Sequence, residues 1–293
     1  MRRFCLIILF LFITCAVAPP AGAEIKIGIL AKRGPEVVQK RWSALGTYLG
    51  ESLGRPVTFV PLKFTDIMPW TRDNIDQFLF ANSWFYVRAN VRRGAAALVT
   101  VKNKGTGTSF GGVIFAGRGR GITDLAGIRG KKVMCPKFSS AGGWIFQKGV
   151  MVKAGILPEK DADILLEGRT HDAVVIAVKD GKADVGTVRT NVLERMNEER
   201  KININDFTIL HPVHHEGFPE RCSTPLYPTW PIASLRDTPP NVARRLKEAL
   251  MSIPPGHPAL DPCKVDRFVE ALDYGPLEEL LRFLKTEPFR NPR

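Results

Sequence analysis

The sequence predicts an α/β protein of two lobes, each built on a mixed, mainly parallel β-sheet, with a hinge between them. Apolar stretches rich in isoleucine and valine alternate with segments of helical periodicity almost from end to end, which is typical of parallel sheets covered by helices. The chain has 293 residues, which is enough for two lobes of about 100–150 residues each. Residues 118–225 also contain a complete run of strand and helix units of their own.

This run predicts an inserted second lobe. We expect residues 24–117 and 226–293 to form the first lobe and residues 118–225 to form the second. The chain then crosses between the lobes twice, near residues 112–116 and 224–233, and these crossings form the hinge. In such architectures small molecules bind in the cleft, at the carboxyl ends of the strands.

The first 23 residues have the pattern of a cleaved signal peptide. Arg2 and Arg3 precede an apolar run over residues 4–18, and Ala21-Gly22-Ala23 has the small-x-small pattern of a cleavage site. The run is short for a membrane span, and no second run of 18 or more apolar residues follows. Cys15 follows large residues rather than the small ones typical of a lipidation site. We therefore expect cleavage after Ala23 and export to the periplasm as a free protein.

The mature part opens with a strand whose residues alternate in polarity, and strands and helices then follow in turn. Strands are expected over residues 24–31, 56–62, 95–101, 111–116, 132–135, 163–166, 183–187 and 207–210. Helices are expected over residues 36–53, 144–154, 172–179, 192–200, 239–251, 265–272 and 277–284, with a short helix or turn over 74–81 and a capped turn over 122–128.

The charge and the cysteine content bound the class of partner. The net charge is +13 and falls to +11 once Arg2 and Arg3 are removed, so acidic partners are favoured. The basic residues are scattered and lack interleaved aromatics, which disfavours nucleic acid. Cys135, Cys222 and Cys263 remain after cleavage. At most one disulfide can form among three cysteines, and the sequence leaves its pairing open.

A serine- and glycine-rich loop follows the strand that ends at Cys135. Ser139, Ser140, Ala141 and Gly142 stand where a helix is expected to begin. The first turn of a helix presents N–H groups without internal partners, and serine hydroxyls add further donors, so this segment suits an oxyanion. A plain capped turn, with glycines for tight packing, is the alternative.

Two later strand-to-helix loops add donors of the same kind. His171 stands at the start of the next expected helix, and its ring can donate to an oxyanion. Arg189 follows a short strand and suits a sulfonate, phosphate or carboxylate, with Thr190 and Asn191 as neutral donors. A capping histidine and a surface arginine are the alternatives. Because such loops meet at one edge of a parallel sheet, the three together favour an anion site.

Aromatic and polar residues are expected to line the first lobe's side of the cleft, with ordinary core packing as the alternative for Trp84, Phe85 and Tyr86. These residues are Asp66, Trp70, residues 82–86 including Tyr86, and Phe110.

Two other chemistries remain weaker alternatives. The segment His211-Pro-Val-His214-His215-Glu216 invites a metal interpretation, but zinc needs about four ligands in fixed geometry. Cys135 beside His171 would suit a thiol nucleophile acting on sulfur compounds, although a buried cysteine fits better. We expect no catalytic residue, no metal and no cofactor.

The segment EGRTHDAVVIAVKDGKADVGTVRTNVLERM, at residues 167–196, resembles the phosphate, phosphite and phosphonate periplasmic binding proteins. It is more similar still to the sensing domains of tetrathionate-type sensor kinases, which share segments such as RWSALGTYL, ANSWFYV, GGVIFA and STPLYPTWPIA. The resemblance covers almost the whole mature chain. It implies a type II periplasmic binding protein that binds an oxyanion through Ser139, Ser140 and His171 without catalysis.

The departures from the family pattern affect the expected ligand. Phe110 stands where such binders have a tyrosine, and Asn191 stands where a carboxylate would meet an aminophosphonate's ammonium. These residues, with Arg189, favour an anion that has no cationic group. Because sensor relatives continue into a membrane span and a kinase while this sequence ends at Arg293, we expect a free, monomeric binding protein. Its partner would be an ABC permease or a sensor histidine kinase, which the sequence does not distinguish.

Overall fold

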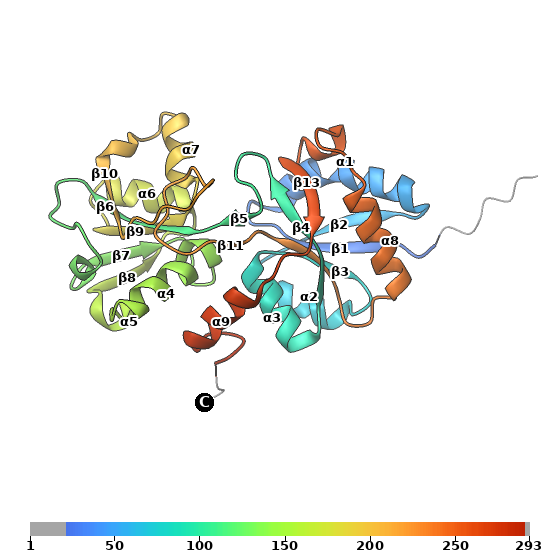
Figure 1. Ribbon diagram of the computed structural model, residues 1–293, viewed down its shortest axis with the longest axis horizontal. Helices are drawn as coiled ribbons and strands as arrows, with labels where there is room; N and C mark the ends of the chain where they lie inside the picture. Colours follow the sequence, from blue (N-terminus) through green and yellow to red (C-terminus); the bar gives the residue numbers. More distant parts are fainter. Residues whose placement is uncertain (1–21, 291–293) are drawn as a thin grey trace, which may run out of the picture.

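The computed structural model describes residues 22–290 and contains two large β-sheets side by side, each covered by helices (Figure 1). The predicted signal peptide, residues 1–23, lies outside the described residues except for its last two. No helix in the described range is both long and apolar enough to cross a bilayer. The two-lobed α/β fold expected from the sequence is confirmed.

The first lobe is built on a six-stranded sheet of order β13-β4-β12-β3-β1-β2. Its strands are β1 (Ile25–Leu30), β2 (Val57–Leu62), β3 (Phe78–Phe80), β4 (Ala96–Asn103), β12 (Pro231–Ser234) and β13 (Val265–Glu270). Its helices are α1 (Pro35–Leu53), α2 (Ile67–Asp73), α3 (Ser83–Arg93) and α8 (Pro240–Met251). Buried side chains of α1 and α8 form one core with β1 and β3, which fixes the end of β1 beside the start of α1.

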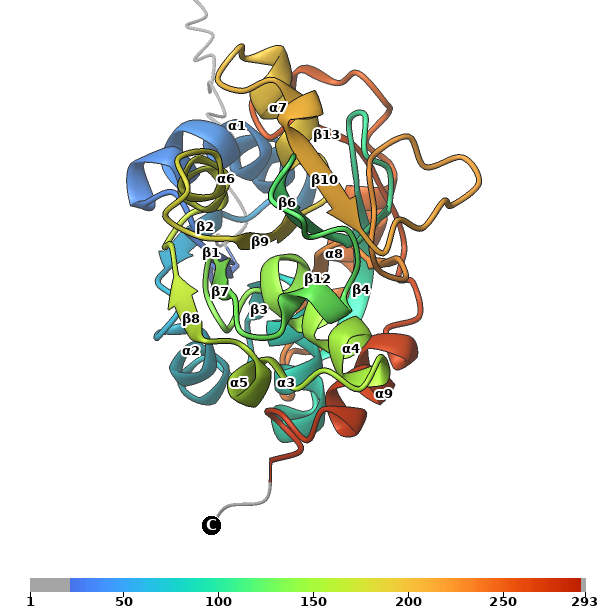
Figure 2. The same cartoon turned by 90° about the vertical axis from the view of Figure 1, so that its left-hand side faces the viewer.

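The second lobe is built on a five-stranded sheet of order β10-β6-β9-β7-β8. Its strands are β6 (Gly112–Gly117), β7 (Lys132–Cys135), β8 (Ile164–Glu167), β9 (Val185–Arg189) and β10 (Phe207–Leu210). Its helices are α4 (Phe146–Lys153), α5 (Pro158–Asp161), α6 (His171–Lys179) and α7 (Val192–Glu198), with a 3-10 turn at Ala126–Ile128. Figure 2 shows α6 and α7 on one side of this sheet and α4 and α5 on the other.

Both sheets are mixed, as expected, but parallel pairings are not the majority. The pairs β1–β2, β1–β3, β7–β8 and β7–β9 are parallel. The pairs β3–β12, β4–β12, β4–β13, β6–β9 and β6–β10 are antiparallel. The expectation of mainly parallel sheets is therefore wrong, because the strands next to the two crossings run back against their neighbours.

Two segments connect the sheets, and they lie side by side. The short strands β5 (Ser109–Phe110) and β11 (Tyr227–Pro228) pair antiparallel between the lobes (Figure 1). Just beyond them, Gly112 donates its N–H to the hydroxyl of Thr224 at 2.9 Å and accepts from the N–H of Ser223 at 2.8 Å. Helix α9 (Gly275–Phe283) contacts both α3 and α4, so it packs against both lobes. The residue limits of the lobes stay a prediction.

Two element predictions are wrong for identifiable reasons. Residues 265–272 were expected to form a helix because apolar residues recur there every three or four positions, yet they contain strand β13. The register of β13 against β4 shifts between Val265 and Arg267. Such a bulge lets Val265 and Phe268 both face the core, which imitates a helical period. Residues 74–81, expected as a helix or turn, contain β3.

Helix α3 has no counterpart among the predicted elements. Its first turn is capped by Asn82, whose side chain accepts from the N–H of Phe85 at 3.0 Å. Gly94 ends it with a φ of 68°. An asparagine before the helix and a glycine after it are ordinary boundary signals, so this helix was predictable.

Candidate functional site

A cavity of about 130 Å³ lies between the two lobes. Arg189, at the end of β9, lines it from the second lobe, and side chains around the β1–α1 connection line it from the first. Its lining residues are Ile29, Leu30, Lys32, Arg33, Gly34, Val37, Val38, Arg41, Trp42, Phe80, Val101, Asn103, Arg189, Trp230 and Cys263. A space of this size suits a small ligand rather than a drug-sized one.

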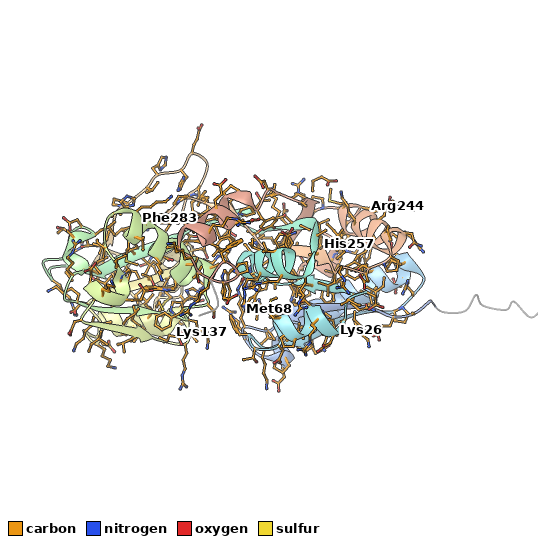
Figure 3. All side chains as sticks on the ribbon, turned by 90° about the horizontal axis from the view of Figure 1, so that it is seen from below. Lys26, Met68, Lys137, Arg244, His257 and Phe283 are labelled. Carbon is orange, nitrogen blue, oxygen red and sulfur yellow. The ribbon has the colours of Figure 1, made fainter. Side chains whose placement is uncertain are left out.

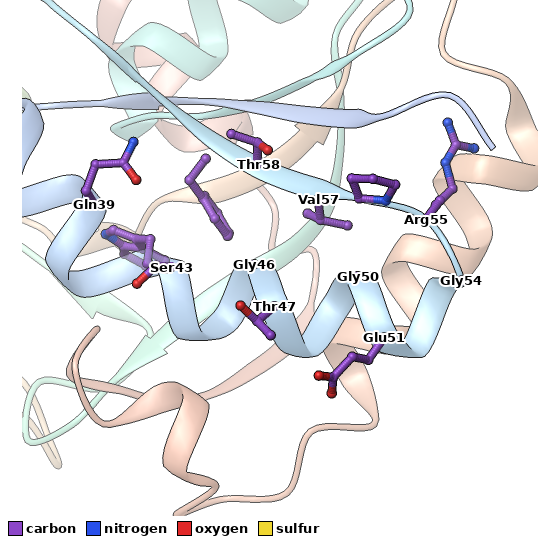
Figure 4. A pocket seen from close by; sticks show the side chains of 13 residues that line it. Gln39, Ser43, Gly46, Thr47, Gly50, Glu51, Gly54, Arg55, Val57 and Thr58 are labelled. Atoms are coloured by element: carbon purple, nitrogen blue, oxygen red, sulfur yellow. The ribbon is translucent and has the colours of Figure 1, made fainter. Parts of the chain in front are cut away.

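A larger hollow of about 630 Å³ lies elsewhere, along α1 and the sheet-edge strand β2 (Figure 4). The side chains that line it include Gln39, Thr47 and Glu51 but none of the predicted site residues. It is open, and its charged lining residues are one glutamate and Arg55. The interlobe cavity is therefore the better candidate, because it contains a predicted residue and a concentration of charge.

One turn of π-helix, Ala141–Ile145, begins within the Ser139–Gly143 segment and continues into α4. Ser140 precedes this turn, and its carbonyl accepts from the N–H groups of Trp144 at 2.9 Å and Ile145 at 3.0 Å. Its hydroxyl makes no capping hydrogen bond. The side chain of Ser140 therefore does not cap this helix, and its half-buried hydroxyl remains available as a donor.

The glycines of this segment are required by packing. A Cβ on Gly142 would lie 2.7 Å from the ring of Phe110. A Cβ on Gly143 would lie 2.5 Å from Pro136, 2.7 Å from the Ser140 hydroxyl and 2.9 Å from the ring of His171. The glycines therefore bring Ser140 and His171 together, while the role of Ala141 and Gly142 as ligand donors stays a prediction.

His171 is the first residue of α6, but Thr170 caps that helix by accepting from the N–H of Ala173 at 3.1 Å. The Nδ1 atom of His171 accepts from the backbone N–H of Arg189 at 3.2 Å. The neutral ring therefore carries its proton on Nε2, as a donor. Burial, followed by the charges of Lys32 and Arg189, lowers the pKa of His171 to about 3. The ring is thus neutral at neutral pH.

Arg189 joins the histidine to the cavity. Its guanidinium lies over the ring of Phe110, 4.4 Å from the centroid, and its Nε atom is buried without a hydrogen-bond partner among the described residues. Burial lowers the pKa of Arg189 to about 10, although the nearby Glu220 acts in the opposite direction. The guanidinium remains charged at neutral pH. A buried donor without an acceptor is costly unless a ligand supplies one.

Thr190 and Asn191 face other partners. Thr190 is buried, and its hydroxyl accepts from the N–H of Gly111 at 3.3 Å, which ties β9 to the first crossing. Asn191 adopts a left-handed conformation with a φ of 69°, and its amide donates to Glu220 at 3.4 Å. Neither residue lines the interlobe cavity.

Phe110 lies with the site, whereas Tyr86 does not. Phe110 is buried against Phe146 and Arg189. Tyr86 packs against Tyr274 of the α9 region, and its hydroxyl accepts from the N–H of Ala97 at 3.2 Å. The contacts of Tyr86 are therefore those of a core residue.

The sequence interpretation missed Lys32, Arg41 and Trp230. Lys32 follows β1, Arg41 lies in the second turn of α1, and the Nζ of Lys32 lies 5.0 Å from the Trp230 ring centroid. A detectable signal was present, because Lys32 and Arg33 follow a strand and precede a helix, as the predicted donors of the second lobe do.

The cleft side of the second lobe also approaches the first at the serine loop. Lys137 lies near the edge of its lobe (Figure 3), and its Nζ is 5.7 Å from the ring centroid of Phe64. Phe64 follows β2 in the first lobe. The segment that carries Ser139 and Ser140 thus faces the opposite lobe.

Comparison with known proteins decides the family. Residues 27–274 match the family described as the periplasmic substrate-binding protein of phosphonate ABC transporters. The chain belongs to this family. Its fold is shared by the Prochlorococcus marinus phosphonate-binding protein PhnD1 in complex with methylphosphonate, with a TM-score of 0.69 and 16% identity over 89% of this chain and 98% of that one. It is also shared by a binding protein component of an ABC phosphonate transporter from Pseudomonas aeruginosa, with a TM-score of 0.67, 16% identity, and coverage of 89% and 86%.

A relative with a different role is more similar in sequence to this chain than these two solved structures are. The tetrathionate sensor histidine kinase of Salmonella typhimurium is 30% identical over 233 residues, which cover 78% of this chain. The match spans 39% of the kinase. The chain therefore corresponds to about two fifths of that relative's length.

The environment of the cysteines fits a substrate-binding protein of this family better than a thiol enzyme. Cys135, Cys222 and Cys263 are all free and buried. Burial, followed by the charge of Glu167, raises the pKa of the Cys135 thiol far above its ordinary value. A nucleophilic cysteine needs the opposite environment, one that is accessible and electropositive.

The histidine-rich segment shows no metal geometry. His211 Nδ1 lies 3.1 Å from the carbonyl oxygen of Ser223, and His215 Nε2 lies 2.8 Å from that of Thr224. Within residues 22–290, no three His, Cys, Asp or Glu side chains are grouped as metal ligands would be.

Proposed function

We propose that this chain is a periplasmic solute-binding protein that captures a small oxyanion between its lobes for an ABC transporter. The anion is either phosphonate-like or phosphate-like, or an oxyanion of sulfur. The observation that carries the proposal is Arg189, a charged group with an unpartnered buried Nε at the interlobe cavity. Its backbone N–H also fixes the neutral tautomer of His171.

The proposed binding mode uses donors only. His171 Nε2–H, the hydroxyls of Ser139 and Ser140, and the guanidinium of Arg189 would donate to the oxyanion, and the first N–H groups of the π-turn would add the helix-start contribution. Hydrogen bonds in which the acceptor is charged are short and strong, and enclosure between the lobes strengthens them further. Phe110 would hold the plane of Arg189.

Calorimetric titration with phosphate, methylphosphonate, sulfite, thiosulfate and tetrathionate tests this function. We expect at least one of these anions to bind, and Arg189→Gln to weaken its binding by at least about tenfold, as loss of a charged hydrogen bond does. Arg244→Gln is the matched control. Arg244 lies on α8, is exposed and forms an ion pair with Glu248 of the same helix, so its loss should leave affinity unchanged. Equal affinity of both variants, or no binding by any anion, would refute the proposal.

A second candidate role follows from the sensor relative. The 30% identity over 78% of the chain favours a sensing subunit that presents the bound anion to a membrane histidine kinase. A strain lacking this protein separates the two roles. Loss of uptake of the anion supports the transporter role, whereas intact uptake with loss of the transcriptional response to the anion supports the sensing role.

Export is part of the proposal. Signal peptidase cleavage after Ala23 would give a mature protein that begins at Glu24. Amino-terminal sequencing of protein from the periplasmic fraction checks this, and a mature protein that begins at another residue or stays in the cytoplasm would contradict it.

A further inference from the structure

Four cationic residues line the interlobe cavity, and three of them come from the first lobe. These three are Lys32, Arg33 and Arg41, and Arg189 faces them from the second lobe. Among the described residues, none of the four forms an ion pair with a carboxylate within 4 Å, although seventeen such pairs occur elsewhere. The cavity is therefore a place where positive charge is concentrated and not neutralised by the protein.

This concentration of charge acts on Lys32 in particular. Desolvation by the surrounding protein, together with the charges of Arg189, Arg33 and Arg41, lowers the pKa of Lys32 to about 7. Lys32 is nevertheless exposed to water on the wall of the cavity, which it lines together with Arg189 of the second lobe. Its Nζ lies 5.0 Å from the centroid of the Trp230 ring. Since the ammonium group of Lys32 forms no ion pair among the described residues, a bound anion would supply its negative partner.

Local structure places this basic group at a fixed position. Gly34, with a φ of 96°, turns the chain from β1 into α1, so that Lys32 and Arg41 lie at the same end of the first lobe. The carbonyl of Arg41 accepts from the Sγ of Cys263 at 2.9 Å, which holds this part of α1 against the start of β13. Lys32 and Arg41 are thus anchored in the first lobe, whereas the serine and histidine donors belong to the second.

The cleft consequently has two anion-attracting ends joined by Arg189. One end comprises Ser140 and His171 in the second lobe, and the other comprises Lys32 and Arg41 in the first. Arg189 belongs to both, because its N–H bonds to His171 while it lines the cavity beside Lys32. An anion with two charged groups would offset more of this positive charge than an anion with one, because four cations that form no ion pair among the described residues line the cavity.

We infer that the ligand is a small dianion with an oxyanion group at each end, such as a disulfonate, a polythionate or a bisphosphonate. Ser139, Ser140 and His171 hold one group, Lys32 and Arg41 hold the other, and Arg189 lies between them. This inference rests on the proposed function, since it names the class of oxyanion bound at the same site.

Matched one-ended and two-ended anions test the inference. Methanesulfonate and methylphosphonate carry one oxyanion group, whereas ethane-1,2-disulfonate and tetrathionate carry two. By calorimetry at pH 7 and physiological salt, we expect a two-ended anion to bind at least about tenfold more tightly than the one-ended anions. Lys32→Gln should weaken the two-ended anion by about tenfold or more and change the one-ended anions by less than about twofold. Lys40→Gln, an exposed lysine of α1 outside the cavity lining, is the control.

The outcomes separate the inference from the proposed function. If one-ended anions bind as tightly as two-ended ones, or if Lys32→Gln weakens both equally, the dianion inference is wrong while oxyanion binding stands. If no anion of either length binds the unaltered protein, the proposed function itself fails. A Lys32→Gln variant with an unchanged Tm ensures that any loss of affinity is local, and Arg41→Gln provides a second, independent test of the same end.

Discussion

Lys32 and His171 lie close enough for their charges to interact, yet they titrate in different pH ranges. In the protein without ligand, the pKa of Lys32 is lowered to about 7 and that of His171 to about 3. Between pH 5 and 9, therefore, the charge at this part of the cleft changes through Lys32 while His171 stays neutral. This separation makes pH a selective probe of the lysine.

Affinity for a two-ended oxyanion should be highest below pH 7 and should fall as the pH rises from 7 to 9. The anion prefers the protonated lysine, and free Lys32 loses its proton in this range because desolvation and the charges of Arg189, Arg33 and Arg41 lower its pKa to about 7. Calorimetry at several pH values measures the fall, and binding should take up protons near pH 8. In Lys32→Gln the slope should disappear, so a slope that persists in this variant would assign the proton to another group.

His171 should make the folded protein sensitive to acid. Its folded pKa is lowered to about 3 from an ordinary value near 6.5. Between these values the unfolded chain binds more protons than the folded one, so stability falls as the pH drops through this window. Urea unfolding at pH 7 and pH 4.5 should show a smaller loss for His171→Gln than for the unaltered protein. An equal loss would mean that His171 is protonated in the folded state.

At the scale of elements, the turn from β7 into α4 depends on a close approach that only glycine allows. Gly143→Ala would place a Cβ within 3 Å of Pro136, Ser140 and His171, and overpacking of this kind costs about 1–3 kcal/mol. Gly50→Ala on α1 is the matched control, since its nearest neighbour would be at 3.4 Å and alanine favours a helix. Urea unfolding should show a loss for the first variant and none for the second. Equal free energies of unfolding for the two variants would mean that the segment around Gly143 accommodates a Cβ without strain.

How far the sequence predicts this protein also differs between elements. Helices α1 and α8 were predictable because each carries one regular apolar face and a clear boundary residue. Strand β13 was not, because a bulge against β4 changed its period, and this pairing partner lies more than 160 positions away in the sequence. Strand β3 is three residues long and fully buried, so its sequence shows no alternation of apolar and polar residues that would predict a strand.

The candidate site was predictable in the same partial way. Strand-to-helix loops in one lobe indicated Ser140, His171 and Arg189, which the structure brings together around Gly143 and the cavity. That Thr190 and Asn191 face the first crossing and Glu220 instead follows from contacts between distant segments. Lys32 also follows a strand and precedes a helix, so the same rule indicates it, but its position opposite Arg189 depends on how the two lobes meet, which no local pattern shows.

For the whole molecule, the opposition of Lys32 and Arg189 across the cavity links ligand charge to lobe closure. Positive groups on the two lobes repel one another, and an anion between them replaces repulsion with attraction to both. A ligand shifts a conformational equilibrium only by its difference in affinity for the two states. An anion that contacts both lobes has such a difference, because it reaches both only when the lobes are close. The β5–β11 pair is the expected pivot.

Saturation with a bound oxyanion should therefore reduce the radius of gyration measured by small-angle X-ray scattering. Arg189→Gln should lose this compaction at the same anion concentration, because it removes the group that belongs to both ends of the cleft, whereas Arg244→Gln should keep it. Raising the salt to 1 M shortens the screening length to about 3 Å, so it should weaken binding and raise the anion concentration needed for compaction. A radius of gyration that stays constant while calorimetry shows full occupancy would mean that the lobes are already held together by α9, which packs against both α3 and α4.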